Sequence, residues 1–213
     1  MNPIVIEVHK IYEIIRNIYT GRDNPPILPH RQNDKEDYAP YKREFEILLE
    51  NVPDIPGVYL WFAKYYQKPI EYIYVGESGT KNTGLIRRFK EEFKNWHHCF
   101  WATAFNSNEY LSQALKLYVE SGEISTRKRY RNSICNDWLK RGATHLAYYS
   151  NIPKDIVKQI QDDLIQLFNN PRGNVKDIRD KPWPLEELHP LSITLYEKLV
   201  ECCKNVIPYK PKW

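Results

Sequence analysis

The sequence predicts an α/β fold of the α+β type, in which a small three-stranded antiparallel sheet is flanked by helices. Two segments, 52–62 and 70–78, are short, aromatic and β-branched, and turn-forming residues bound each of them, as is typical of strands. The segments around them carry apolar residues at helical spacing. The length of 213 residues, with 42% hydrophobic and 27% charged residues, suits one globular core with additions.

The N-terminal part of the chain, 1–52, is expected to be a helical extension. Isoleucine and valine recur at helical spacing over residues 3–19, directly after a residue pair that favours a helix start. The polar, proline-rich stretch 20–37 is predicted to be a linker, and Pro40 is predicted to open a second helix.

The alternation within the two strand segments predicts which side chains share a face of the sheet. In the first strand, one face carries Val58, Leu60 and Phe62, and the other carries Gly57, Tyr59 and Trp61. In the second strand, Ile73 and Val75 are expected to lie opposite Tyr72, Tyr74 and Gly76. The two strands are expected to pair antiparallel, and 144–150 is predicted to be the third strand.

Helices are predicted over 84–96, 107–121, 155–168 and 190–203. On a helical wheel centred on Phe89, in the first of these, Arg88 lies about 100° away, at the rim of the apolar stripe. Arg87 lies about 160° away on the same wheel and is expected to face solvent.

The positive charge is concentrated in one window of the chain. Between Glu123 and Gly142, six basic residues stand against two acidic ones, and this excess equals the net charge of +4 of the whole chain. Tyr130 and Trp138 lie among these cations, a mixture that suits a nucleic-acid backbone, although a solvated helix face is the alternative. The candidate DNA-binding residues are Arg127, Lys128, Arg129, Arg131, Lys140 and Arg141.

Four sequence features occur in a fixed order: Gly57-Val58-Tyr59, Tyr74-Val75-Gly76, an arginine on the following helix, and an asparagine that closes the turn Pro171-Arg172-Gly173-Asn174. This order resembles the GIY-YIG nuclease superfamily over about residues 55–175. The resemblance implies a catalytic domain at 53–180 with a basic helical insertion at 97–142, followed by a helical C-terminal extension at 181–213.

The resemblance also implies a role for each site residue. Tyr59 matches the tyrosine proposed as general base for the attacking water, and Tyr74 matches the tyrosine near the scissile phosphate. Arg88 matches the arginine that neutralises charge on the phosphate, and Asn174 matches the asparagine that braces the site. The implied activity is hydrolysis of double-stranded DNA with Mg²⁺ or Mn²⁺, because such chemistry needs a proton acceptor and cations beside the phosphate.

Two positions depart from the family pattern. Gln161 stands where the family has its metal-binding glutamate, and an amide is a poor replacement for a carboxylate at Mg²⁺. Gln161 is expected to face the interior, and its neighbours Asp162 and Asp163 are expected to be solvated. The fourth residue after the helix arginine is Glu92, where many relatives have histidine or tyrosine. Either this chain is an inactivated Glu→Gln variant, or the metal ligand was lost or relocated naturally.

We therefore expect a DNA endonuclease of the stand-alone restriction type, with a repair or phage-type nuclease as the nearest alternative. A catalytically dead DNA-binding module and a protein-interaction domain are the alternatives from other classes. A palindromic target would require a homodimer or two monomers acting in turn. The sequence contains no apolar run long enough to span a membrane, and its four cysteines lack a disulfide framework, so we expect a cytoplasmic protein without a membrane partner.

Overall fold

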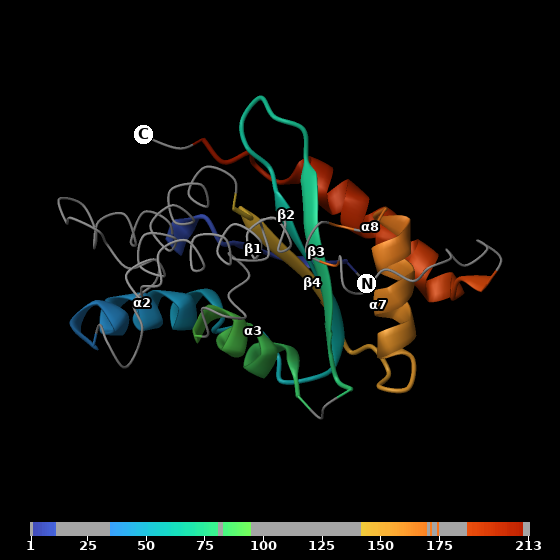
Figure 1. The fold of residues 1–213 in the computed structure, drawn as a ribbon, viewed down its shortest axis with the longest axis horizontal. Helices are drawn as coiled ribbons and strands as arrows, with labels where there is room; N and C mark the ends of the chain where they lie inside the picture. The colour runs from blue at the N-terminus through green and yellow to red at the C-terminus, as the bar shows by residue number, and fades with distance from the viewer. Residues whose placement is uncertain are drawn as a thin grey trace, which may run out of the picture.

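A four-stranded antiparallel sheet separates two helical layers in the computed structural model, which describes residues 2–11, 35–80, 83–94, 142–169, 171, 174 and 187–210 (Figure 1). The strands are β1 (Ile4–Glu7), β2 (Gly57–Ala63), β3 (Glu71–Ser78) and β4 (His145–Ser150), and they lie in the order β1-β4-β2-β3. Helices α2 (Lys35–Leu48) and α3 (Leu85–Lys94) cover one face, and α7 (Val157–Leu167) and α8 (Pro190–Asn205) cover the other. The mixed α/β class is as predicted, but the sheet has four strands instead of three.

The additional strand comes from the segment that the sequence predicted to be helical. Residues Ile4–Glu7 form β1, which pairs antiparallel with β4 from Ile4 opposite Tyr148 to Glu7 opposite His145. The prediction of a helix from residue 3 is therefore wrong over this strand. Three consecutive β-branched side chains suit a pleated strand, and the partner that stabilises it lies about 140 residues away along the chain.

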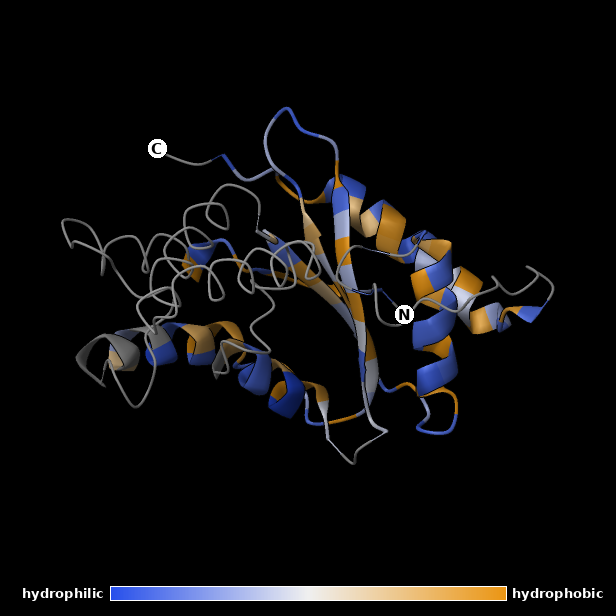
Figure 2. Ribbon diagram, in the orientation of Figure 1, coloured by the Kyte–Doolittle hydropathy of each residue, from blue (hydrophilic) through white to orange (hydrophobic). Residues whose placement is uncertain are grey.

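The central strand β2 carries a hydrophobic core on each face of the sheet. Tyr59 and Trp61 pack with α2 and α3, whereas Val58, Leu60 and Phe62 pack with α7 and α8. This division confirms the faces predicted for the first strand. Figure 2 shows the apolar stripes of the helices turned toward the sheet.

The predicted faces of β3 are wrong at Ile73, and also at Tyr72, which packs on the α7 side together with Val75. The register with β2 shifts there, because Trp61 lies opposite Tyr74 and Phe62 lies opposite Tyr72. Ile73 has no partner in this pairing and packs in the core on the α3 side, whereas Val75 packs on the α7 side. A β-bulge of this kind breaks the two-residue period on which the prediction rested.

Three predicted helices are present, and one begins earlier than expected. Helices α3 and α7 fall within the predicted ranges 84–96 and 155–168, and α8 begins at Pro190 as predicted but ends at Asn205 instead of Cys203. Helix α2 starts at Lys35, so that Pro40 lies inside it and does not open it, and the last residues of the predicted linker belong to this helix. The predicted helix 107–121 lies outside the described residues, as does most of the insertion 97–142. No helix in the described part of the chain is long and apolar enough to cross a membrane.

Candidate functional site

Two motif glycines let the central strands approach their neighbours closely enough to form the site. Gly76 lies opposite Tyr59 across β2 and β3, and a Cβ atom at Gly76 would lie 2.3 Å from the Tyr59 hydroxyl oxygen. A Cβ atom at Gly57 would lie 2.1 Å from the backbone oxygen of Tyr149 on β4. Any larger residue at position 76 would displace the phenol ring of Tyr59. The second motif therefore needs glycine at this position for steric reasons.

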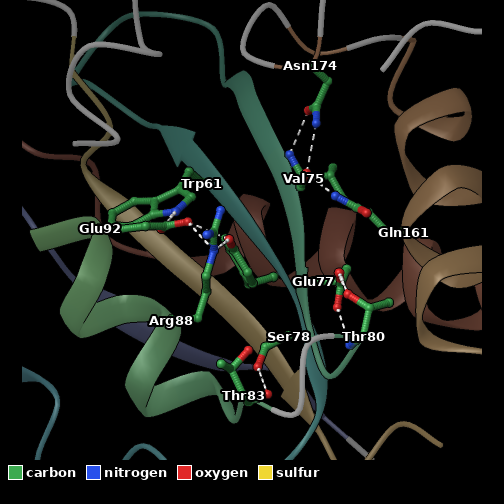
Figure 3. A network of polar contacts seen from close by, with 11 residues as sticks. Trp61, Val75, Glu77, Ser78, Thr80, Thr83, Arg88, Glu92, Gln161 and Asn174 are labelled. Carbon is green, nitrogen blue, oxygen red and sulfur yellow. Dashed lines mark hydrogen bonds and ion pairs between the residues drawn. The ribbon is translucent and has the colours of Figure 1, made fainter. Parts of the chain in front are cut away.

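Tyr59 belongs to a buried polar network on the α3 face, together with Trp61, Arg88 and Glu92. Figure 3 shows Trp61, Arg88 and Glu92 of this network turned toward one another. The Tyr59 hydroxyl donates to Glu92 Oε1 at 2.5 Å, and Trp61 Nε1 donates to Glu92 Oε2 at 3.1 Å. Arg88 Nε lies 3.0 Å from the Tyr59 hydroxyl and 3.0 Å from Glu92 Oε1. The strand and the helix therefore hold the phenol, the carboxyl and the guanidinium in one hydrogen-bonded cluster.

The environment of this cluster shifts its acid–base equilibria. Burial, and then the neighbouring Glu92 carboxyl, raise the pKa of Tyr59 well above its ordinary value. Burial also raises the pKa of Glu92, against the opposing effect of Arg88. The charge interaction with Tyr59 has the largest effect on the pKa of Arg88 and raises it. Burial lowers this pKa, and Glu92 raises it further, so the guanidinium stays charged. Tyr59 is therefore a neutral phenol at neutral pH.

Two further groups connect this buried cluster with the surface. The Tyr74 ring lies with its centroid 6.1 Å from that of Tyr59 and is partly exposed. The Arg88 side chain is 33% exposed, while that of Glu92 is 3% exposed. The helix wheel predicted this rim position for Arg88, and it predicted the solvent-facing position of Arg87, which is 63% exposed and pairs with Asp54 at 2.7 Å.

The two carboxamides, Asn174 and Gln161, meet β3 at the residue after Tyr74. The Asn174 side chain accepts from the Val75 backbone N–H and donates to the Val75 backbone oxygen, both at 2.8 Å. Gln161 Nε2 donates to the same Val75 oxygen at 3.2 Å (Figure 3). These amides brace the outer edge of β3, while the Tyr59 cluster lies on the α3 face of the sheet.

The side chains around Gln161 do not fit a divalent metal ion. Gln161 Oε1, the only oxygen of this side chain, accepts a hydrogen bond from Lys158 Nζ at 2.8 Å, and Lys158 also pairs with Asp162 at 2.9 Å. An ammonium group so close to the expected ligand oxygen repels a second cation. Among the described residues, no group of three or more His, Cys, Asp or Glu could hold a metal.

Sequence reasoning gave no role to Glu92, which joins the cluster, and it misplaced Asp163. On the helical wheel Glu92 lies about 60° from Phe89, between Leu85 and Arg88, so an acidic residue at the rim of the apolar stripe of α3 was a usable signal. Asp163 was predicted to be solvated, but it is 3% exposed, and its Oδ2 accepts from the Ser192 hydroxyl at 2.7 Å. The backbone N–H of His189 donates to the same oxygen at 3.0 Å, so Asp163 fixes the start of α8 against α7.

The predicted DNA-binding residues, which run from Arg127 to Arg141, lie outside the described residues. The described site therefore consists of the Tyr59 cluster with Tyr74 and the amide brace at Val75. No protein-family model, no curated protein and no solved structure matches this chain.

Proposed function

We propose that this chain is a GIY-YIG-type DNA endonuclease that carries Gln161 at the metal position. The observation that carries the proposal is the hydrogen bond that joins the buried Tyr59 to the partly exposed Arg88, beside the ring of Tyr74. A tyrosine hydroxyl for the attacking water and a cation for the phosphate are two of the groups that phosphodiester hydrolysis needs. The motif order in the sequence and the basic insertion support the same proposal.

Arg88 has the geometry to bind a phosphate at this rim. Its Nε is bonded to the buried Tyr59 and Glu92, which fixes the plane of the guanidinium. A guanidinium held in this way presents its remaining N–H groups as a fork that matches two phosphate oxygens. Arg88 would therefore position the phosphate next to Tyr59.

A pair of arginine variants tests phosphate binding. Arg88→Met should weaken binding to a short DNA duplex by roughly tenfold to hundredfold and reduce its salt dependence, because a charged hydrogen-bond donor to phosphate is lost. Arg87→Met, on the same helix but paired with Asp54 away from the cluster, is the matched control and should change the affinity far less. Equal affinities for the two variants would contradict the proposed site.

A second experiment tests cleavage. The chain as it stands should bind plasmid DNA without cutting it, and Gln161→Glu should cut in the presence of Mg²⁺ or Mn²⁺. Because Lys158 would pair with the introduced carboxylate, the double variant Gln161→Glu/Lys158→Met should cut faster than Gln161→Glu alone. Gln159→Glu, which places the same charge on an exposed position of α7, is the matched control and should not cut.

A DNA-binding module without catalysis is the second candidate, and the Gln161 geometry favours it. The amide donates to Val75 O and accepts from Lys158, so both of its ends are satisfied without a metal. This candidate predicts salt-dependent DNA binding and no cleavage by any of these variants. A chain with no salt-dependent DNA affinity would instead be a protein-interaction domain.

Within the enzyme class we propose a site-specific restriction-type nuclease, and a repair or phage-type nuclease is the alternative. A palindromic target would require two copies of the chain, arranged as a homodimer or acting in turn. Cleavage of a plasmid at one defined sequence distinguishes the restriction type from an enzyme that recognises DNA shape.

A further inference from the structure

The shortest hydrogen bond described at the site joins the proposed base to an acid that the family pattern does not contain. The Tyr59 hydroxyl donates to Glu92 Oε1 at 2.5 Å, and Glu92 is almost completely buried. Trp61 Nε1 holds the second carboxyl oxygen at 3.1 Å, so the carboxyl cannot turn away from Tyr59. Short O–H···O bonds to a carboxyl are the geometry in which a proton transfers readily.

Tyr59 alone is poorly suited to accept a proton from water. A phenol acts as a base only after it loses its own proton, and in this site burial and the nearby carboxyl strongly oppose the phenolate. Arg88 does not relieve this difficulty by itself, because its charge is shared between Tyr59 and Glu92. A neutral phenol that gives its proton to a neighbour while it takes another never has to become a phenolate.

We propose that Glu92 is the proton acceptor behind Tyr59, so that the two residues form a relay. This inference rests on the proposed hydrolysis. A water oxygen bonds to phosphorus and passes its proton to the Tyr59 oxygen, and the Tyr59 hydroxyl proton moves to Glu92. The P–O bond to the leaving group breaks, and the leaving oxygen takes a proton from solvent. The reverse transfer through Tyr59 then returns the proton from Glu92 to solvent.

Glu92 acts through Tyr59 and is therefore a positioning residue in this scheme. Among the described residues, the titratable groups around the pair are Tyr59 on β2, Tyr74 on β3 and Arg88 on α3. Of these, Glu92 is the group that changes charge in the acidic range, since both phenols and the guanidinium keep their protons there. The relay therefore makes the cleavage rate rise with pH as Glu92 ionises.

The test uses the full chain with Gln161→Glu as the parent and measures plasmid cleavage rate against pH. Glu92→Gln should lower the rate by about 10²-fold to 10⁴-fold and abolish the acidic limb of the profile. Glu92→Asp should recover part of the rate and keep the limb. Tyr59→Phe should lose the limb as well, and the double variant Tyr59→Phe/Glu92→Gln should be no slower than the slower single variant.

Two controls separate the relay from a structural role. Glu91→Gln makes the same change at an exposed position of α3 and should keep the rate and the profile of the parent. The affinity of Glu91→Gln for a short DNA duplex should stay within about threefold of the parent. Because Glu92 and Tyr59 also hold Arg88, the rates of their variants are compared at saturating DNA, so that a change in phosphate binding is separated from a change in the chemical step. If Glu92→Gln does not fold, Tyr59→Phe alone is used to test whether the acidic limb of the pH–rate profile disappears.

The outcomes separate this inference from the proposed function. If the parent cuts and Glu92→Gln cuts within threefold of it with an unchanged pH profile, the relay is overturned and the nuclease stands. If Tyr59→Phe retains the acidic limb, the relay is also overturned. If the parent binds DNA but never cuts, hydrolysis and relay are overturned together, and if it does not bind, the proposed function is overturned as well.

Discussion

Asn174 completes the outer edge of β3 with a single side chain, and its removal should destabilise the fold measurably. The side chain is fully buried and supplies one acceptor and one donor to the backbone of Val75, both at 2.8 Å. In Asn174→Ala the Val75 N–H loses its hydrogen bond to the Asn174 side-chain oxygen, at a cost of about 1–3 kcal/mol for a buried unsatisfied group. The Val75 oxygen still accepts a hydrogen bond from Gln161 Nε2 in this variant, so the loss of its hydrogen bond from Asn174 costs about 1 kcal/mol.

The expected loss in the free energy of unfolding is therefore about 2–4 kcal/mol, measured by urea denaturation at neutral pH. Asn174→Asp keeps the acceptor for the Val75 N–H but places a carboxylate oxygen against the Val75 oxygen, so it should be at least as unstable at pH 7. Protonation restores a donor, so this variant should regain stability as the pH falls toward the ordinary aspartate pKa of about 4. Asn51→Ala, at an exposed position, is the control and should cost less than about 0.5 kcal/mol. An Asn174→Ala variant as stable as this control would refute the reasoning.

Three further predictions follow from the contacts of single residues. In the Gln161→Glu chain, Gly76→Ala should lower the free energy of unfolding by about 1–3 kcal/mol and abolish DNA cleavage, because its methyl group overlaps the Tyr59 ring; unchanged cleavage would contradict this. Asp163→Ala should lower the free energy of unfolding by about 2–3 kcal/mol, because Asp163 loses its hydrogen bonds to the start of α8, whereas Asp162→Ala should lower it by less than about 0.5 kcal/mol. Similar losses for the two variants in urea denaturation would contradict this role of Asp163. Burial lowers the pKa of His145 to about 4 from 6.5, so the unfolded chain binds more protons in this interval and stability should fall by about 3 kcal/mol as the pH drops from 6.5 to 4. His145→Phe should remove most of that fall in acid titrations of stability.

Local patterns were sufficient to predict the part of the fold that positions the motif tyrosines. Strands β2 and β4 and helices α3, α7 and α8 have a consistent period and clear turn signals, and their ranges agree with the prediction. The alternation along β2 correctly placed Tyr59 on the face covered by α3. The wheel position of Arg88 was correct for the same reason, because α3 has one apolar face.

The features that the sequence could not predict depend on partners far away along the chain. β1 has apolar residues whose spacing fits a helix locally, and only its pairing with β4 makes it a strand. The bulge at Ile73 is set by the register between β2 and β3, which no local period shows. Asp163 is buried because α8 covers it, so its solvation could not be judged from α7 alone.

The burial of Glu92 differs from these cases, because a helical wheel of α3 puts it about 60° from Phe89, at the rim of the apolar stripe. The resemblance supplied a histidine or tyrosine for that position and gave no reason to examine a carboxylate there. The structure shows this carboxyl at the centre of the polar cluster, bonded to Tyr59, Trp61 and Arg88.

A structure of the chain bound to a short DNA duplex decides whether Arg88 and Tyr59 hold a phosphate. We expect a backbone phosphate on the exposed N–H groups of Arg88, next to the Tyr59 hydroxyl and Tyr74, with the Tyr59–Glu92 hydrogen bond intact in the complex. DNA bound on another surface, with Arg88 and Tyr59 far from every phosphate, would refute the proposed site.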